Sequence, residues 1–303
     1  MIDKEKLPKK VRLFEVGPRD GLQNEKTPIS TEDKYEFIKA LLLAGYNDIE
    51  ATSFVRPDRI PQLSDASELF PRIKKLNAKA KFWSLIPNLQ GLQNAQKVGC
   101  THFALFSATS DEFTKKNINV TVDESFTRMQ EVVDQIEDMS FVRGYISTVF
   151  GCPYQGDIDP QKVLRVIERF IKMGVTELSL GDTIGVATPL QVQSLIDEIQ
   201  KNFDLQMFAM HFHDTRGMAL ANVLTSLSRG IAKFDSSAGG LGGCPYAKGS
   251  SGNLASEDLI YLLNSLNIEH GVDLDKLIVA SAATLKLLSK EAPSKYHQAV
   301  KGS

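Results

Sequence analysis

The sequence predicts a (β/α)8 TIM barrel, formed as a single domain over residues 1–303. Short β-rich runs recur along the chain, and segments with apolar residues at helical spacing lie between them. The expected strands cover residues 11–17, 48–52, 81–86, 102–107, 142–148, 177–182, 206–213 and 233–239. Strand–helix alternation over roughly 250 residues favours a closed parallel barrel over an open doubly wound sheet.

The segments between the strands carry helix signals. Residues 31–46, 160–175 and 188–203 place apolar side chains at helical spacing, and a glycine or polar residue ends several of these segments. Residues 273–289 are expected to form a further helix after the eighth unit, so that residues from about 271 to 303 become a C-terminal helical extension packed on the barrel.

The dinucleotide-binding alternative requires G-x-G-x-x-G after the first strand, and the chain reads GPRDGLQNEK there. A later glycine cluster fails the same test, because Pro245 stands where the last glycine should be. A Walker A sequence is also absent from the chain.

The composition narrows the class of partner. With 35 basic and 37 acidic residues and a net charge of -2, the chain shows no electrostatic footprint for nucleic acid or an anionic membrane. The longest apolar segments are too short to span a bilayer. The three cysteines form neither a disulfide framework nor a metal knuckle, which fits a reducing cytoplasm. We expect a small-molecule or protein partner.

The carboxyl ends of several strands are rich in groups that bind metals. His211 and His213 lie two residues apart on one strand, so they point the same way, into the barrel mouth, while Phe212 points toward the helices. Closure of the barrel brings Asp20 near them, and the loop after strand eight can supply Asn253. A histidine pair alone is as often structural, but with oxygen ligands it suits Mg2+, Mn2+ or Zn2+.

Other strand ends suggest catalytic groups. The glycine-rich loop 239–253 holds Cys244, whose thiol can exchange a proton if the loop acts as a lid, although a surface loop with an incidental thiol is the plain alternative. Arg19 can face a developing negative charge or form a surface ion pair. Glu50 and Asp182 can position Arg19, bind water or act as bases, or form structural ion pairs. Cys100 and Cys152 are interpreted as packing residues.

The motifs FEVGPRDGLQNE, IEATSF, LGDTIGVATP, HFHDT and GGLGGCPYAKGSSGNLASED follow these strands. Through them, nearly the whole chain closely resembles the 3-hydroxy-3-methylglutaryl-CoA (HMG-CoA) lyases. The Arg-Asp-Gly and His-x-His elements are shared with isopropylmalate and homocitrate synthases, whereas the cysteine-bearing glycine loop is the specific signal.

The resemblance implies a dimeric (β/α)8 enzyme that binds Mg2+ or Mn2+ and splits HMG-CoA into acetyl-CoA and acetoacetate. The implied metal ligands are Asp20, His211, His213 and Asn253. Arg19 would contact the substrate carbonyl and enolate, Cys244 would be the catalytic loop thiol, and Gln23 would touch substrate. Glu50, Asp182 and Glu257 would take supporting roles.

Two features depart from the pattern of many relatives. Arg216 stands after HFHDT where an aromatic residue is expected, which puts local substrate contacts in doubt but not the metal site. The chain lacks the transit peptide and carboxyl-terminal cysteine of the mitochondrial enzymes, which suggests a bacterial-type cytoplasmic form.

Three rival functions and one related substrate stay open at the level of sequence. A Claisen-condensing enzyme would use the same metal set but has less evident use for Cys244. An iron-dependent oxygenase could use two histidines and a carboxylate, although such triads usually lie on all-β frames. A non-enzymatic metal-binding protein, or cleavage of a related 3-hydroxyacyl-CoA, completes the alternatives. In the favoured reaction, His213 or Asp20 accepts the hydroxyl proton and Cys244 protonates the carbanion.

Overall fold

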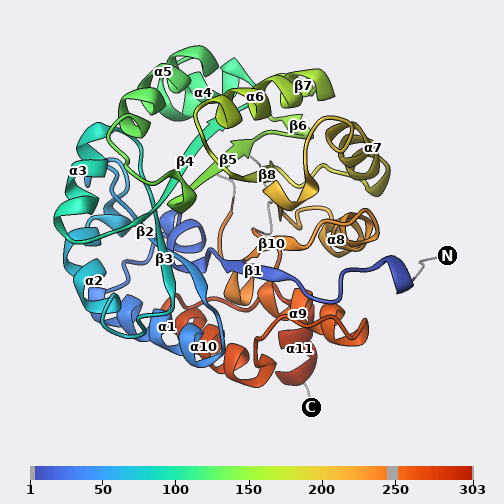
Figure 1. Ribbon diagram of the computed structural model, residues 1–303. Helices are drawn as coiled ribbons and strands as arrows, with labels where there is room; N and C mark the ends of the chain where they lie inside the picture. The colour runs from blue at the N-terminus through green and yellow to red at the C-terminus, as the bar shows by residue number, and fades with distance from the viewer. Residues whose placement is uncertain (1–3, 244–251, 302–303) are drawn as a thin grey trace.

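The computed structural model describes residues 4–243 and 252–301, and within them eight parallel strands close into a barrel (Figure 1). Around the barrel the strands follow the order β1-β10-β9-β8-β5-β4-β3-β2. Their bounds are β1 Arg12–Glu15, β2 Asp48–Ser53, β3 Lys81–Leu85, β4 His102–Ala108, β5 Val142–Ser147, β8 Glu177–Asp182, β9 Phe208–Phe212 and β10 Lys233–Ser236. This architecture confirms the predicted (β/α)8 fold.

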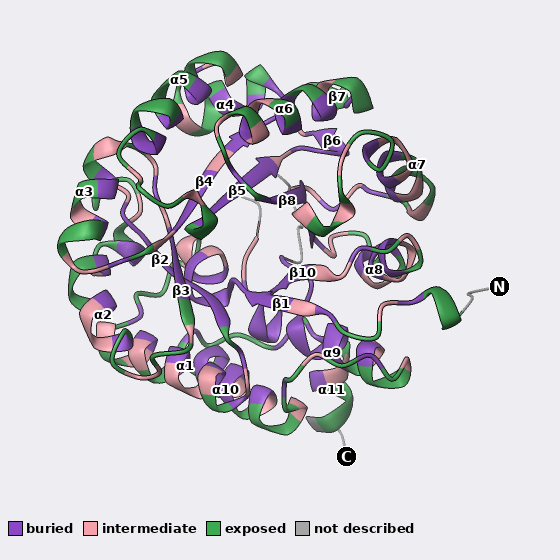
Figure 2. Ribbon diagram, viewed as in Figure 1, coloured by how far each residue is buried: buried purple, intermediate pink, exposed green. Residues whose placement is uncertain are grey.

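Closure is made by the first strand, which pairs with β10 on one side and β2 on the other. Arg12 is in register with Lys233, and Phe14 is in register with Asp48. Every residue of β2, β8 and β9 is buried, because helices cover the outer face of the sheet and side chains fill its interior. Figure 2 shows this buried cylinder inside a shell of half-buried helices.

The helices form the outer ring, and local sequence signals fix where they begin. Thr188 and Gln191 form a reciprocal capping box at the start of α7, and Asp159 caps α6 just before Pro160. The helices are α1 Thr31–Leu43, α2 Ala66–Ile73, α3 Leu89–Lys97, α4 Asp111–Ile118, α5 Val122–Val133, α6 Pro160–Lys172, α7 Pro189–Ile199, α8 Ala219–Ser228, α9 Ser256–Ser265, α10 Leu274–Leu287 and α11 Lys295–Lys301.

Short helical turns join some of these elements. Two of them carry the candidate site: η2, a π-helical turn at Gly17–Gly21, follows β1, and η6, a 3-10 turn at Ala238–Gly240, follows β10. The others are η1 Lys4–Lys6, η3 Pro61–Leu63, η4 Met139–Phe141 and η5 Leu205–Met207. A small antiparallel hairpin, β6 Gly151–Cys152 and β7 Gly156–Asp157, was not predicted.

The C-terminal helices cover the barrel on the side of its first strands. Helix α10, which matches the helix expected at 273–289, packs against α1, and α11 packs against α9 (Figure 1). These contacts support the expected extension, and the treatment of residues 1–303 as one domain stays a prediction.

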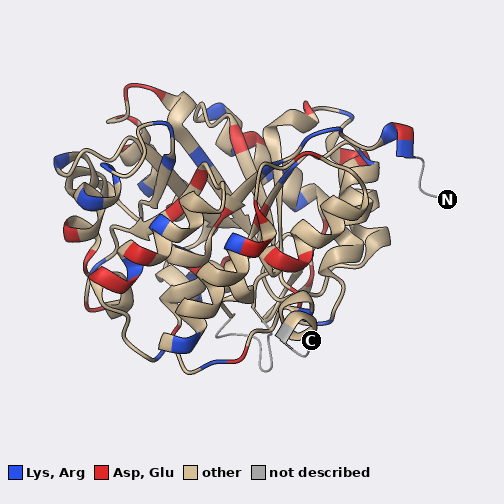
Figure 3. Ribbon diagram, turned by 90° about the horizontal axis from the view of Figure 1, so that it is seen from below, with Lys and Arg blue, Asp and Glu red and all other residues tan. Residues whose placement is uncertain are grey.

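The outer surface mixes charges of both signs. In the view of Figure 3, basic and acidic residues are interspersed over the visible helices and loops. Among the described residues, none of the helices is long and apolar enough to cross a membrane.

Candidate metal centre and active site

The predicted metal ligands come from three segments at the carboxyl ends of the strands. Asp20 lies in η2, directly after β1. His211 is in β9, and His213 follows that strand. Asn253 reaches the same place because its segment forms an antiparallel bridge with His213. The parallel strands of the barrel deliver these side chains to one mouth, as the sequence analysis expected.

The three groups lie close enough to share one cation. One ligand atom from each of Asp20, His211 and His213 lies within 4.8 Å of the other two. Phe212, between the histidines, packs instead in the outer core, where its ring stacks on Phe150 with centroids 6.3 Å apart. The alternation of strand side chains therefore places both imidazoles on one side, and the expected meeting with Asp20 is confirmed.

The surroundings of Asp20 keep its carboxylate ionised. Burial acts to raise its pKa, but the opposing charges of Arg19, His211 and His213 and a hydrogen bond from Asn253 lower the pKa to about 2. Its side chain is 17% exposed, so it remains open to a ligand from the mouth. An ionised oxygen with this access is suited to a hard divalent cation.

The surroundings shift the pKa values of the two imidazoles in opposite directions. Burial, followed by the charge of His211, lowers the pKa of His213 to about 4, so His213 is neutral near pH 7 and offers a nitrogen lone pair. Burial acts to lower the pKa of His211, but the hydrogen bond to Asp235 and the negative charges of Asp235 and Asp20 together outweigh it and raise the pKa. Nδ1 of His213 is buried, and no described residue hydrogen-bonds to it.

Asn253 completes the donor set. Its Nδ2 donates to Oδ2 of Asp20 at 2.9 Å and to the carbonyl of Leu241 at 3.1 Å. Its Oδ1 is buried and accepts no hydrogen bond from the described residues. A buried acceptor left without a partner is costly unless a cation or water satisfies it. The two orphaned atoms, on His213 and Asn253, thus fit a metal ion held with Asp20 and His211.

Gly242 allows this close packing. Its φ of +114° lies in a region that residues with a side chain rarely adopt, and a Cβ there would stand 2.6 Å from Nδ2 of Asn253. The glycines of the loop therefore permit close backbone approach, one of the uses proposed from the sequence.

Arg19 joins two carboxylates beside the cluster. It is 6% exposed; its Nη1 contacts Oδ1 of Asp20 and its Nη2 contacts Oε2 of Glu50, both at 2.6 Å. Nη1 also lies 3.4 Å from Oε1 of Gln23. Burial raises the pKa of Glu50 even though Arg19 opposes the shift. The register of β2 against β3 shifts between Glu50 and Thr52, and such irregularities commonly re-aim side chains next to active sites.

Tyr145 is a site residue that the sequence analysis missed. Its hydroxyl donates to Oε2 of Glu50 at 3.1 Å and accepts from Nη1 of Arg143 at 3.2 Å. Its ring lies 5.6 Å from the guanidinium carbon of Arg19. The signal was its position in the carboxyl half of strand β5, with a side chain that alternation turns into the barrel.

Asp182 and Glu257 contact loop backbone, and their hydrogen bonds to described residues do not reach the ligand cluster. Oδ1 and Oδ2 of Asp182 accept from the amides of Val186 and Ala187 at 2.9 and 3.0 Å, and burial raises its pKa to about 6. Both oxygens of Glu257 lie 2.9 Å from the amide of Gly239, and burial raises its pKa to about 7. Each carboxyl holds the shape of a loop at the barrel mouth.

Arg216 bridges two loops. Its Nη1 donates to the carbonyls of Ile184 at 3.0 Å and Gly185 at 2.9 Å, so it ties the turn after β8 to the segment after β9. The unexpected arginine at this position therefore has a structural contact.

The cysteines separate into two groups. Cys100 and Cys152 are buried and free, in keeping with packing roles, and burial raises the pKa of Cys100 to about 11. Cys244, the thiol singled out in the glycine loop, lies outside the described residues.

Comparison with known proteins gives the family. The HMGL-like family model matches residues 10–283. The cytoplasmic 3-hydroxy-3-methylglutaryl-CoA lyase of Rattus norvegicus is 47% identical over 97% of this chain and 85% of its own length. The hydroxymethylglutaryl-CoA lyase of Pseudomonas aeruginosa superposes with a TM-score of 0.94 at 46% identity, covering 98% of this chain and 99% of that one.

A third relative was solved with ligands. The HMG-CoA lyase of Acinetobacter baumannii, in complex with coenzyme A and 3-methylmalate, has a TM-score of 0.91 at 36% identity and covers 96% of this chain and 95% of its own. These likenesses confirm the resemblance drawn from the strand-end motifs. The chain belongs to the HMGL-like family.

Proposed function

We propose that the chain is a carbon–carbon lyase that cleaves HMG-CoA to acetyl-CoA and acetoacetate. The observation that carries the proposal is the meeting of Asp20, His211 and His213 within 4.8 Å in a chain nearly half identical to lyases of that name. The acyl-CoA partner is supported by the relative solved with coenzyme A.

The donor set fits a divalent metal, with Mg2+ or Mn2+ preferred and Zn2+ compatible. Asp20, His211, His213 and Asn253 would hold it, since two imidazoles with carboxylate and amide oxygens suit these ions. When bound, the ion supplies Lewis-acid chemistry that makes the tertiary hydroxyl of the substrate easier to deprotonate.

The reaction requires two proton transfers and one bond cleavage. The 3-hydroxyl loses its proton to His213 or Asp20, the bond between C2 and C3 breaks, and the electron pair enters the thioester carbonyl as an enolate. The hydroxyl-bearing carbon becomes the ketone of acetoacetate. Protonation of the enolate carbon, which we assign to the thiol of Cys244, gives acetyl-CoA. A positioned proton donor typically contributes about 10²- to 10⁴-fold in rate.

Arg19 stabilises the enolate oxygen in this scheme. Its guanidinium is fixed by Asp20 and Glu50 before substrate arrives, so it does not have to reorganise as charge develops. Gln23, beside Arg19, contacts substrate at the same rim. Asp182 and Glu257 act indirectly, by holding the loops of the mouth in place.

The condensing alternative is not favoured, because the relatives reported above carry lyase names. A homodimer and a cytoplasmic location remain predictions. Light scattering coupled to size exclusion, expected to give about twice the 33.5 kDa chain mass, tests the dimer.

One assay tests the function. HMG-CoA cleavage is followed by acetyl-CoA release, with Mg2+ and after its removal by chelation, in the wild type and in Cys244→Ala. We expect turnover only with the metal and a large loss in the variant. Cys100→Ala is the matched control, because that thiol is buried ahead of β4. Metal-independent turnover, or full activity of Cys244→Ala, contradicts the assigned roles.

A further inference from the structure

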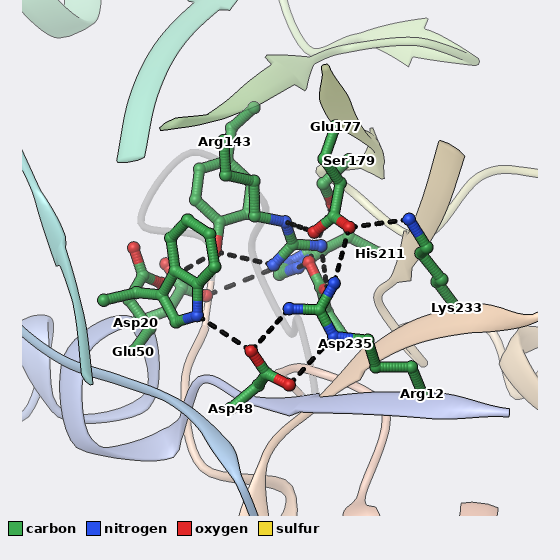
Figure 4. A network of polar contacts seen from close by, with 12 residues as sticks. Arg12, Asp20, Asp48, Glu50, Arg143, Glu177, Ser179, His211, Lys233 and Asp235 are labelled. Carbon is green, nitrogen blue, oxygen red and sulfur yellow. Dashed lines mark hydrogen bonds and ion pairs between the residues drawn. The ribbon is translucent and has the colours of Figure 1, made fainter. Parts of the chain in front are cut away.

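The inside of the barrel holds a continuous set of charged side chains that leads to the metal centre (Figure 4). At its amino end, Arg12 pairs with Asp48 at 2.6 Å and with Glu177 at 2.9 Å. Glu177 lies 3.3 Å from Nε of Arg143, whose Nη2 contacts Oδ1 of Asp235 at 2.5 Å. Burying charges inside a barrel is costly unless they are paired, and each of these side chains has a partner of opposite charge.

Asp235 is the member that touches a proposed metal ligand. Its side chain is 0% exposed, and besides His211 it contacts the donors Arg143 and Ser179. Oδ1 accepts from Arg143, while Oδ2 accepts from Oγ of Ser179 at 2.7 Å and lies 3.2 Å from Nδ1 of His211. A carboxylate that already accepts from two other groups can only accept from the imidazole as well.

This contact decides which nitrogen of His211 carries the proton. With Nδ1–H donated to Asp235, the lone pair lies on Nε2, and Nε2 is the nitrogen that faces Oδ2 of Asp20 at 4.0 Å. A carboxylate on the far nitrogen of a ligating histidine fixes both its tautomer and its ring orientation.

Arg143 also reaches Asp20 by a second route. Its Nη1 donates to Tyr145, Tyr145 donates to Glu50, and Glu50 pairs with Arg19, which contacts Asp20. The guanidinium is 1% exposed and packs 3.8 Å from the ring centroid of Phe14, so it has little freedom to move. The guanidinium of Arg143 is therefore linked both to His211, through Asp235, and to Asp20, through the second route.

We propose that Asp235, held by Arg143 and Ser179, is the positioning residue of the metal centre and sets His211 in the tautomer that presents Nε2 to the ion. The proposal rests on the metal-binding role of His211 given above. It adds a requirement for a residue that touches neither the ion nor the substrate.

The decisive variant is Asp235→Asn. The amide keeps the shape of the carboxylate and can still accept from Arg143, but it then presents an NH2 group to Nδ1 of His211. The imidazole must move its proton to Nε2, which removes the lone pair. We expect the Mn2+ dissociation constant of the full chain, measured by EPR titration, to rise about 10- to 100-fold. Nitrogen-15 NMR of the five histidines in the metal-free protein should show the changed tautomer.

Two further variants separate positioning from stability. Asp48→Asn makes the same chemical change in the same network, but Asp48 contacts Arg12 and Trp83 rather than a histidine. It should lower the melting temperature and leave Mn2+ affinity unchanged. Ser179→Ala removes one donor from Oδ2 of Asp235 and should weaken binding by less than Asp235→Asn, with the histidine tautomer retained.

The outcomes are distinct. If the wild type does not bind Mn2+, the proposed metal function fails. If the wild type binds while Asp235→Asn binds equally well with an unchanged His211 tautomer, the positioning role is overturned. Equal weakening by Asp48→Asn and Asp235→Asn also overturns it, because the effect would then follow general stability.

Discussion

At the scale of single residues, the site depends on the shape of a guanidinium. Arg19 contacts Asp20 through one terminal nitrogen and Glu50 through the other, each at 2.6 Å. A lysine carries the same charge on a single nitrogen at the end of a flexible stem, so it lacks the rigid fork that fixes two carboxylates in one geometry. The two contacts aim the cation before any substrate is present.

Arg19→Lys should therefore lower kcat by about 10²- to 10³-fold in the lyase assay, because the fixed donor to the enolate is lost. Mn2+ affinity should change much less, since Asp20, His211 and His213 stay in place. Arg72→Lys, at an exposed ion pair with Glu32, is the control and should keep wild-type kinetics. Unchanged kcat in Arg19→Lys would remove Arg19 from the mechanism.

Some residues of the site could be predicted from the sequence, and others could not. Asp20, His211 and His213 could be predicted because each lies at or just beyond the carboxyl end of a strand, and alternation along one strand fixes the direction of both histidines. Tyr145 and Asp235 were missed because their importance depends on partners from other strands. The contact of Asp235 with Arg143 joins positions 92 residues apart and exists only after the barrel closes.

At the scale of elements, the side chain of Glu15 holds two turns at the barrel mouth, η2 and η6, together. Glu15 is fully buried at the end of β1; its Oε1 accepts from the amides of Gly17 in η2 at 2.8 Å and Ala238 in η6 at 2.9 Å. Its Oε2 accepts from Ser256 at 2.7 Å. The turn that carries Arg19 and Asp20 is thus tied to the base of the glycine loop.

The carboxyl group of Glu15 should make the stability of the fold depend on pH. Burial raises the pKa of Glu15 to about 8, above the ordinary 4.5, so folding favours the protonated form. The stability it contributes is present below pH 4.5 and is lost as the pH rises through 8. The melting temperature of the wild type should fall between pH 5.5 and 8.5 relative to Glu15→Gln, which cannot ionise.

Differential scanning fluorimetry across that range measures the effect of Glu15. Glu269→Gln serves as the control, because Glu269 forms an exposed pair with Lys10 and should track the wild type. Parallel melting curves for the wild type and Glu15→Gln at every pH would contradict the assignment.

Several elements whose bounds sequence reasoning did not place are short. Strands β6 and β7 have two residues each, and α11 has seven, lengths at which periodicity gives no signal. Helix α11 begins where Asp258, from α9, accepts from the amides of Lys295 and Tyr296 at 3.1 and 2.8 Å. Ser294 is a local cap as well, because its Oγ accepts from the amide of His297 at 3.0 Å. The contacts from Asp258 are supplied by tertiary structure, so the local sequence cannot reveal them.

At the scale of the whole molecule, the barrel is closed around paired charges. The alternation of strands and helices predicted the closed sheet. Each strand–helix unit is encoded in one continuous stretch of sequence, and eight such units fit a barrel. The polar interior could not be predicted in this way. It depends on the register that brings Arg143 of β5, Glu177 of β8 and Asp235 of β10 into one layer.

Removing the buried guanidinium of Arg143 should lower the stability of the fold substantially. In metal-free protein, Arg143→Met leaves Asp235 buried without its ion-pair partner, which typically costs about 3 to 5 kcal/mol. We expect the melting temperature to fall on the order of 5 to 10 °C. Arg229→Met, which breaks a partly exposed pair with Asp197, should shift it by less than about 2 °C. Equal shifts in melting temperature for Arg143→Met and Arg229→Met would show that the buried pair stabilises the fold no more than the partly exposed one.

The most direct test of the whole account is to locate the ion. Crystals of the full chain grown with saturating Mn2+ are measured at the manganese absorption edge, and an anomalous difference map is calculated. The account predicts one strong peak within about 2.3 Å of ligand atoms of Asp20, His211 and His213. A map with no peak there, or with the ion bound at another place, would contradict it.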